Sequence, residues 1–383
     1  LFKITYIISV DKYIIIMLGE LLMKKNILIA SYNLDFGGIE TSLINLLKNI
    51  NFDKYKVTLV LEKKEGVFLK DVPKDVVIKE YNVSDAKNFL FRKIVNLLKR
   101  IKWLLFNYKR YYASISYATY SKPSSFLART SSNNKTLFVH SNYYMAYDKD
   151  INKIKEFFDG IKINEYNHVV FVSNESKKDL CKIYKTIESK SVTINNLVDY
   201  ERILKLSNKK IEIKRTNKKI FLFVGRLDES SKRLTLLLRV ANKCKQDKVK
   251  AIFWIIGSGP DEKKYKDIVN KDRLDNVIFM GAKKNPYPYM KACDYLILTS
   301  RYEGFPVVYN EAIILDKPII TTIDVSDDYV SIPNRFGYVV DENNIYEKVK
   351  SLSEKKERLK EKVDYDALNK KRMKLIEDLM EMK

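Results

Sequence analysis

The stretch that decides the fold is Cys293-Asp294-Tyr295-Leu296-Ile297-Leu298-Thr299-Ser300, followed by Glu303-Gly304-Phe305-Pro306 and, eight residues after Glu303, by Glu311. The run 293–300 predicts a buried strand with a polar tip, and residues 306–315 predict a helix. Ligands of open parallel sheets bind at this edge of the strands, and free N–H groups at a helix start favour an anion. Two carboxylates beside such a site are suited to accept paired hydrogen bonds from the vicinal hydroxyls of a sugar or ribose.

Length and composition are those of a two-domain globular protein with a strong basic excess. The chain has 383 residues, 46% of them hydrophobic, and a formal net charge of +23. Such a charge fits nucleic acid, an anionic membrane surface or a polyanionic small substrate. Lys, Asn and Ile are abundant, so a solvated lysine surface explains part of the excess equally well.

Cysteine and histidine usage argues against a metal centre. Cys181, Cys244 and Cys293 form no CxxC pair, so we predict buried free thiols in a reducing compartment. His140 and His168 are the only histidines, and they form no Cys/His cluster of the kind that binds zinc. We therefore expect no metal site.

The first residues are interpreted as lying outside the fold. Residues 4–23 are rather apolar, but charged side chains interrupt them and no cleavage pattern follows, which disfavours both a membrane-spanning helix and a signal peptide. Met23 and the apolar run after it predict the natural start and a first buried strand. Residues 1–22 are thus expected to be an upstream extension.

Two series of alternating strands and helices follow one another, which predicts two parallel sheets covered on both faces. The first series occupies residues 23–202 and the second 220–364, and the Lys-, Asn- and Ser-rich stretch 203–219 predicts a linker. An amphipathic helix is expected at the C-terminal end. The predicted strands are 26–31, 56–61, 76–80, 113–117, 136–140, 168–172, 191–194, 220–224, 251–256, 277–280, 295–298, 318–321 and 337–340. The predicted helices are 38–49, 88–109, 151–159, 175–185, 232–246, 261–271, 286–292, 306–315 and 366–383.

Residues 90–112 combine apolar, aromatic and basic side chains in a helical pattern. Two interpretations stay open. A basic amphipathic helix with aromatics fits an anionic membrane face. An ordinary helix packed on the first sheet, with a lysine-rich outer side, fits the same letters.

Glycines and basic residues follow other predicted strands. Gly37 and Gly38 open the first helix, where paired glycines let a phosphate approach the backbone, although a tight turn explains them too. Gly225 and Arg226 end a strand, and Lys232 is expected at the start of the next helix. An Arg fork and a Lys point charge facing one cleft would clamp a diphosphate, the alternative being an ordinary surface pair.

Gly257 and His140 extend this set. The run Gly257-Ser258-Gly259-Pro260 is a further glycine turn after a strand, and Asp261 is expected to cap the next helix. His140 ends an apolar strand. That position makes a functional role as plausible as a structural one.

Taken together, these motifs resemble those of retaining glycosyltransferases of the GT-B fold, the large family four (glycosyl transferases group 1). The resemblance rests on GGIE at 37–40, VGRL at 224–227 with Lys232, GSGP at 257–260 and EGFP with its second Glu over 303–311. It covers the chain from Met23 onward and is strongest over 220–341. It implies two doubly wound, Rossmann-like α/β domains facing a cleft, with the donor bound mainly to the second. The helix 365–383 would pack back on the first domain.

The resemblance also implies residue roles. Arg226 and Lys232 would neutralise the diphosphate of a nucleotide-sugar donor, expected to be a UDP-sugar, as it leaves. Glu303 would meet hydroxyls of the donor sugar and Glu311 those of the ribose. His140 resembles a first-domain histidine beside the donor sugar. The catalytic set is then Arg226, Lys232, Glu303 and His140, and the donor-binding set is Gly37, Gly38, Gly225, Gly257, Gly304, Phe305, Pro306, Val307 and Glu311.

The implied reaction transfers a sugar to a hydroxyl with retained anomeric configuration, and it needs no metal because the cationic pair stabilises the leaving group. Two departures stand out: Lys232 comes one residue later than in many relatives, and Asn310 occupies a commonly apolar position. The basic charge, the stretch 90–112 and the lack of a secretion signal predict a glycan or lipid-linked acceptor. We expect a cytoplasmic enzyme, peripheral on the inner face of the membrane, in cell-surface polysaccharide assembly.

Two other functions stay open. A nucleotide-sugar epimerase has the same architecture, but it would bring more catalytic carboxylates and histidines than this chain offers. A basic nucleic-acid-binding protein would cluster aromatic residues with arginines in a recognisable module, which this sequence lacks. No nucleic acid is therefore expected as a partner.

Overall fold

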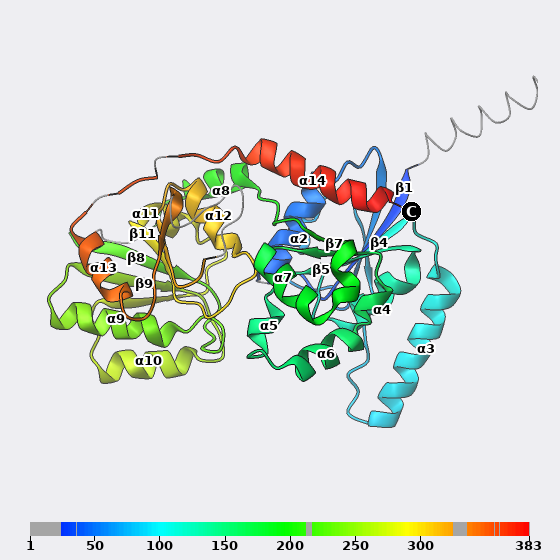
Figure 1. Ribbon diagram of the computed structural model, residues 1–383, viewed down its shortest axis with the longest axis horizontal. Coiled ribbons are helices and arrows are strands. Elements are labelled where there is room, and N and C mark those ends of the chain that lie inside the picture. Colours follow the sequence, from blue (N-terminus) through cyan, green and yellow to red (C-terminus); the bar gives the residue numbers. More distant parts are fainter. Residues whose placement is uncertain are drawn as a thin grey trace, which may run out of the picture. The chain divides into compact units, whose positions relative to one another are not determined.

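The computed structural model describes residues 24–35, 37–211, 217–324, 335–355, 357–359 and 361–382. These residues form two parallel β-sheets with helices between successive strands (Figure 1). The predicted α/β class with two doubly wound, Rossmann-like sheets is confirmed. The expected extension 1–22 lies outside the described residues.

The first sheet has seven strands in the order β3-β2-β1-β4-β5-β6-β7. Its inner strand β1 pairs in parallel on both sides, Ile27 lying opposite Val57 of β2 and Ala113 of β4. The inner strands are continuous buried apolar runs because both faces of a parallel sheet are covered. The strands are β1 (Lys25–Ser31), β2 (Tyr55–Leu61), β3 (Val77–Glu80), β4 (Ala113–Ser116), β5 (Asn134–Val139), β6 (His168–Phe171) and β7 (Ser191–Thr193).

Seven α-helices belong to this half of the described chain, and three of them were not predicted. The missed helices are α4, α5 and α8. Helix α4 buries Ser124, Ser125 and Ser131, so its inner face lacks the apolar periodicity that would reveal it. The helices are α2 (Gly38–Asn49), α3 (Phe89–Asn107), α4 (Lys122–Ser131), α5 (Tyr143–Ala146), α6 (Ile151–Gly160), α7 (Asn174–Ile183) and α8 (Tyr200–Ser207), with 3₁₀ turns at Leu69–Asp71, Ile163–Glu165 and Lys185–Lys190.

The predicted linker 203–219 needs a correction, because its first residues belong to α8 and its last residue, Lys219, begins β8. Helix α8 was missed because it is only eight residues long and runs directly into the Lys- and Asn-rich stretch that follows it. It begins with a genuine cap, since the Asp199 carboxylate accepts a hydrogen bond from the Arg202 N–H at 3.1 Å.

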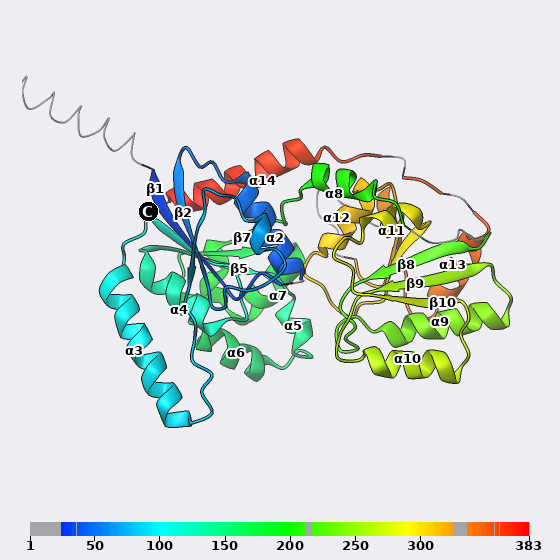
Figure 2. The ribbon, with the colours of Figure 1, turned by 180° about the vertical axis from the view of Figure 1, so that it is seen from behind.

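The second sheet has six strands in the order β10-β9-β8-β11-β12-β13. At its centre the ring of Phe221 in β8 stacks on Phe253 of β9 and Tyr295 of β11, with centroids 5.6 and 5.3 Å apart. Helices α9 and α10 cover one face, and α11 and α12 the other (Figure 2). The strands are β8 (Lys219–Val224), β9 (Ala251–Ile256), β10 (Val277–Gly281), β11 (Tyr295–Leu298), β12 (Ile319–Thr321) and β13 (Gly337–Val339). The helices are α9 (Leu234–Gln246), α10 (Glu262–Lys271), α11 (Tyr287–Ala292), α12 (Val307–Ile314), α13 (Ile345–Ser353) and α14 (Tyr365–Glu381).

Residue contacts divide the chain into two compact units. Of the described residues, those within Leu1–Phe138, Asp159–Val170 and Met373–Lys383 form the first unit, and those within Val139–Phe158 and Phe171–Arg372 form the second. The end of α14 therefore belongs to the first unit. There the Glu381 carboxylate pairs with the ammonium groups of Lys25 and Lys54, and the Asn134 amide donates to the carbonyl of Met380 at 3.0 Å.

Cys181, Cys244 and Cys293 are all buried free thiols, as predicted. Within the described ranges, no helix has the length and apolar character needed to cross a membrane.

Candidate active site

The order of strands in the second sheet reverses between β8 and β11, which lie side by side. Ligands of doubly wound sheets bind beyond the carboxyl ends of the strands at such a switch point. The chain leaves β8 through Gly225 and Arg226, and it leaves β11 through Thr299 and Ser300 toward Glu303. The topology thus brings two of the predicted motifs to one edge of the sheet.

At this edge the Lys232 ammonium forms an ion pair with the Glu303 carboxylate. The hydroxyl of Ser300 donates to the same carboxylate oxygen at 2.7 Å, and the hydroxyl of Thr299 donates to the Lys232 carbonyl at 3.1 Å. Both partners of the ion pair are largely but not wholly buried, with 22% and 12% of the side chain exposed. A cation and an acid from distant parts of the sequence are therefore held together with access to solvent.

The expected position of Lys232 at a helix start is wrong. Helix α9 begins only at Leu234, and Arg233 before it adopts the left-handed conformation with φ 49°. Lys232 lies instead in the loop after β8, with its N–H donating to the Asp228 carbonyl at 2.8 Å.

The same loop is fixed to the neighbouring glycine turn by acidic side chains. The Glu229 carboxylate accepts hydrogen bonds from the Thr235 N–H at 3.1 Å and the Tyr265 hydroxyl at 2.9 Å. Asp261 precedes α10, but its side chain accepts from the Glu229 N–H at 2.8 Å and makes no capping bond. Its predicted capping role is therefore wrong, and it anchors the Lys232 loop instead.

Arg226 is far more exposed than Lys232 and Glu303. Its side chain is 69% exposed, and its guanidinium lies 3.9 Å from the Asp228 carboxylate. Such a loose surface pair contributes little energy. The guanidinium is therefore able to turn toward an anionic ligand at small cost.

Glycine is required at Gly257 and Gly304 for different reasons. Gly257 has φ +151°, and a Cβ there would overlap the carbonyl oxygen of Gly225. A Cβ on Gly304 would overlap the carbonyl oxygen of His140, which belongs to the same compact unit. The structure therefore brings His140, which follows β5, next to the Glu303 loop.

Phe305 and Pro306 lead into helix α12, which begins at Val307. Phe305 is buried against Tyr309, with ring centroids 6.2 Å apart. No side chain caps α12, so its first N–H groups are unclaimed by capping and suited to a phosphate or hydroxyl oxygen.

Glu311 lies one turn into α12 and is buried. The Tyr287 hydroxyl, from α11, donates to its carboxylate at 3.0 Å. Burial raises the pKa of Glu311 to about 7, an effect that the Tyr287 hydrogen bond and the charge of Arg202 only partly offset. Sequence reasoning missed Tyr287, because no local pattern links it to a carboxylate 24 residues further along the chain.

Asn310, noted as a departure from the family pattern, has a structural role. It is fully buried, and the Tyr365 hydroxyl at the start of α14 donates to its side-chain oxygen at 3.2 Å. The ring of Tyr365 stacks on Tyr200 of α8. A polar residue at 310 thus ties the Glu311 helix to its neighbours.

The predicted glycines of the first unit lie at the switch point of the other sheet. Gly37 and Gly38 follow β1, which neighbours β4 at the reversal of strand order. A Cβ on Gly37 would overlap the carboxylate of Glu40, which is buried and accepts a hydrogen bond from the Tyr120 hydroxyl at 3.3 Å. Burial raises the pKa of Glu40. The start of α2 thus carries an uncapped N-terminus beside a buried acid.

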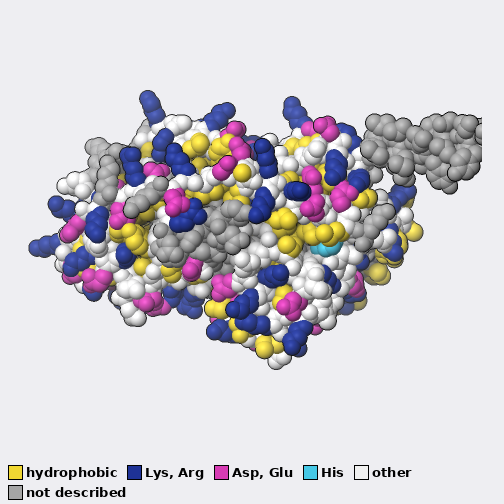
Figure 3. All heavy atoms as spheres, turned by 45° about the horizontal axis from the view of Figure 1, so that its top comes forward, with side chains coloured by type: hydrophobic (Ala, Val, Ile, Leu, Met, Phe, Trp, Pro, Cys, Tyr) yellow, Lys and Arg dark blue, Asp and Glu magenta, His cyan; other side chains and the backbone are white. Residues whose placement is uncertain are grey.

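The large positive charge is not concentrated on the face drawn in Figure 3, where Lys and Arg side chains are spread among acidic and neutral ones. Within the described residues, no group of three or more His, Cys, Asp or Glu side chains is placed to hold a metal ion.

Comparison with known proteins finds similarity to glycosyltransferases. The family described as "Glycosyl transferases group 1" matches residues 205–372. An uncharacterized glycosyltransferase of Methanocaldococcus jannaschii is 28% identical over 164 residues, which are 41% of this chain and 40% of the relative. The N-acetylgalactosamine-N,N'-diacetylbacillosaminyl-diphospho-undecaprenol 4-alpha-N-acetylgalactosaminyltransferase of Campylobacter jejuni is 27% identical over 187 residues, 48% of this chain and 49% of the relative. The matches thus span less than half of either relative.

Among solved structures, Anabaena Alr3699/HepE in complex with UDP and glucose superposes with a TM-score of 0.71 at 16% identity, covering 94% of this chain and all of that one. At this identity the likeness concerns the fold. It extends over both sheets, whereas the family match concerns the second half of the chain.

Proposed function

We propose, from the match of residues 205–372 to the glycosyl transferases group 1 family and the GT-B fold of the chain, that the protein transfers a sugar from a nucleoside diphosphate sugar to a hydroxyl group. The observation that carries this proposal is the ion pair of Lys232 and Glu303 at the β8/β11 switch point. It supports the proposal because a cation suited to a diphosphate and a carboxylate suited to sugar hydroxyls lie together at one edge of the sheet.

The donor diphosphate would exchange with the Glu303 carboxylate as partner of Lys232. Arg226, exposed beside the same loop, would add a second cation. As the bond from the sugar to the diphosphate breaks, negative charge grows on the leaving oxygen, and preorganised cations stabilise it most at that moment. We propose that these two residues supply the charge that the leaving group needs, and that the reaction requires no metal ion.

Released from Lys232, the Glu303 carboxylate would accept hydrogen bonds from hydroxyls of the donor sugar. Glu311 would do the same for the ribose, with the Tyr287 hydroxyl holding its carboxylate in place. The uncapped start of α12 would offer N–H groups to the donor between them. We propose UDP as the nucleotide, supported by the UDP in the Anabaena structure.

For the acceptor we propose a glycan or a lipid-linked glycan, in cell-surface polysaccharide assembly at the cytoplasmic face of the membrane. The Campylobacter relative is supportive, since its name specifies a diphospho-undecaprenol acceptor and an alpha linkage. Transfer would occur with retention, the acceptor attacking from the face that the diphosphate leaves and a donor phosphate oxygen taking its proton.

The experiment is a transfer assay with a panel of nucleotide sugars and a lipid-linked acceptor fraction, in which nucleotide release and the anomeric configuration of the product are measured. We expect acceptor-dependent release of UDP and a product with the configuration of the donor. Inversion would contradict the retaining mechanism. Conversion of the nucleotide sugar to an epimer without an acceptor would contradict transfer itself.

A further inference from the structure

Helix α3 is amphipathic, but its apolar face points to solvent, whereas a helix that packs on a sheet turns its apolar face toward the sheet. Seven of its leucine and isoleucine side chains fall within an arc of about 120° around the helix. All of them are exposed, Leu90 by 68%, Leu98 by 60% and Leu105 by 74%. We call this set the apolar stripe; its members are Leu90, Ile94, Leu97, Leu98, Ile101, Leu104 and Leu105.

The side of α3 that packs on the protein is nearly opposite to the apolar stripe, and it is largely polar. Its one buried residue is Trp103, which belongs to the same buried cluster as Leu28 and Leu127. Two helical turns before Trp103, the Asn96 side chain accepts a hydrogen bond from the Ser84 N–H at 2.8 Å and donates one to the Ser84 carbonyl at 3.1 Å. Lys99 donates to the carbonyl of Asn82. These contacts fix which face of the helix points outward.

In Figures 1 and 2, α3, drawn in cyan, runs along the outside of the first unit beside α4. The interpretation of residues 90–112 as an ordinary helix with a lysine-rich outer side is therefore wrong, because the outer side is leucine-rich. Soluble proteins seldom expose a continuous apolar surface of this length, and such patches mark sites that another surface covers.

The charges around the apolar stripe indicate what covers it. Lys93 and Lys102 lie just beyond its two margins, and both are exposed. No Asp or Glu occurs between Asp85 and Asp148. A second copy of the chain would bring the same basic margins together and repel. An apolar stripe with cationic margins matches a surface that is apolar inside and anionic outside.

We propose that α3 is a docking site for an anionic lipid bilayer, on which it lies flat with the apolar stripe among the acyl chains. Lys93 and Lys102 then reach the lipid phosphates, their aliphatic stems lying along the boundary. The helix lies in the interface and does not cross the bilayer, in keeping with its several basic residues. This inference rests on α3 alone and is independent of the transfer reaction.

The test is co-sedimentation of the full chain with vesicles of phosphatidylcholine alone or with about one third phosphatidylglycerol. We expect binding to the anionic vesicles that weakens with salt, and much weaker binding to the neutral ones. Replacing two exposed stripe residues, as Leu98→Ser with Leu105→Ser, should reduce binding at least about tenfold. The matched control Ile151→Ser with Ile278→Ser also removes exposed apolar side chains but lies outside α3, and it should bind like the wild type.

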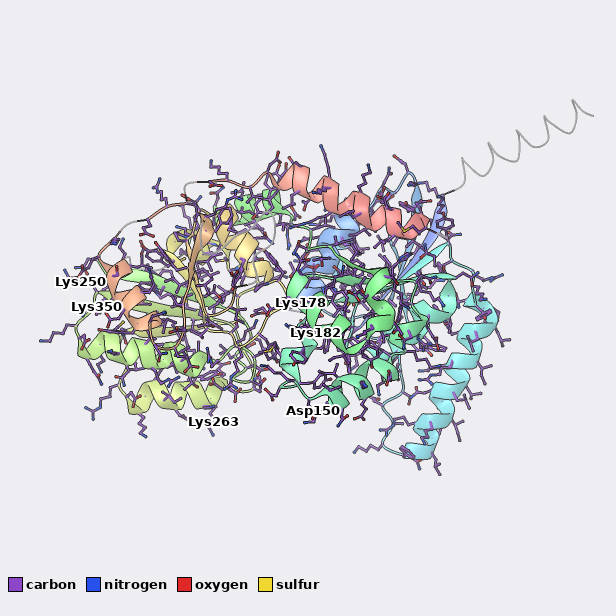
Figure 4. The ribbon with its side chains drawn as sticks, viewed as in Figure 1. Asp150, Lys178, Lys182, Lys250, Lys263 and Lys350 are labelled. Atoms are coloured by element: carbon purple, nitrogen blue, oxygen red, sulfur yellow. The ribbon has the colours of Figure 1, made fainter. Side chains whose placement is uncertain are left out.

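A second pair of variants tests whether binding to the vesicles requires the lysines beside the apolar stripe. Lys93→Gln with Lys102→Gln should weaken binding and flatten its salt dependence, whereas Lys250→Gln with Lys263→Gln, which removes two exposed lysines of the second unit, should change neither (Figure 4). Unchanged unfolding temperatures would show that all four variants are folded. Absence of binding to anionic vesicles, equal binding of the stripe variant, or a dimer that the stripe variant abolishes would overturn the proposal.

Discussion

Glu311→Gln separates the cost of a buried carboxylate in folding from its use in ligand binding. Glu311 has a folded-state pKa of about 7, raised from 4.5 mainly by burial. Because the folded-state value lies above the unfolded one, its stabilising contribution is complete below about pH 4.5 and is lost as the pH rises through about 7. At pH 8 this difference between the folded-state and unfolded-state pKa destabilises the folded protein by about 3 kcal/mol.

Glutamine has nearly the same shape and does not ionise, and its side-chain oxygen can still accept the hydrogen bond from Tyr287. We therefore expect the variant to be more stable than the wild type at pH 8, by up to about 3 kcal/mol or about 10 °C in unfolding temperature. At pH 5 the two should be nearly equal. The measurement is thermal or urea unfolding across this pH range.

The same substitution should weaken nucleotide binding at pH 8, because hydrogen bonds to a carboxylate are worth about 1.5–3 kcal/mol and those to a neutral amide about half as much. Glu62→Gln is the matched control. Burial also raises the pKa of Glu62 to about 7, but this residue belongs to the first unit and bonds Ser121. It should reproduce the pH-dependent stabilisation without loss of binding. The reasoning is refuted if Glu311→Gln gains no stability at pH 8 or binds nucleotide as tightly as the wild type.

Three further outcomes are expected. Arg226→Ala should lower turnover about 10²–10³-fold, since removing one donor to a developing anion costs about 3–4 kcal/mol; normal turnover would remove Arg226 from the clamp. Activity should survive EDTA, and loss of activity that Mg²⁺ or Mn²⁺ restores would contradict the metal-independent mechanism. Burial alone would raise the pKa of Glu381, but hydrogen bonds from Lys25 and neighbouring groups lower this pKa to about 2. Glu381→Gln should therefore lower the free energy of unfolding by roughly 1–2 kcal/mol at pH 7, allowing for the 28% exposure of the side chain. That difference should shrink as the pH falls from about 4.5 toward 2, and a constant difference in urea unfolding would contradict the assigned ion pairs.

The strands were predictable because buried parallel strands are continuous apolar runs, as in β9, which is buried along its whole length. Helices that bury polar residues were not, and α4 shows why: its inner positions hold serines. Sequence spacing also located Glu303 and Glu311 at a strand end and a helix. It could not show that Arg233 adopts a left-handed conformation and thereby delays α9 past Lys232.

Contacts between residues far apart in the chain could not be predicted from the sequence. The partner of Lys232 lies 71 residues away, and that of Glu311 24 residues away. In α3 the periodicity revealed the apolar stripe, but only the packing of Trp103 showed that the stripe points outward. Which face of an amphipathic helix is covered depends on its neighbours, and no local pattern encodes them.

The most direct test of the central claim is calorimetric titration of the protein with UDP, GDP, ADP and their sugars, on the wild type, Lys232→Ala and the surface control Lys250→Ala. We predict that one nucleotide diphosphate, expected to be UDP, binds the wild type and the control alike and binds Lys232→Ala at least about tenfold more weakly. Equal binding to all three proteins would contradict a donor site at the β8/β11 edge, and so would the absence of binding by any nucleotide.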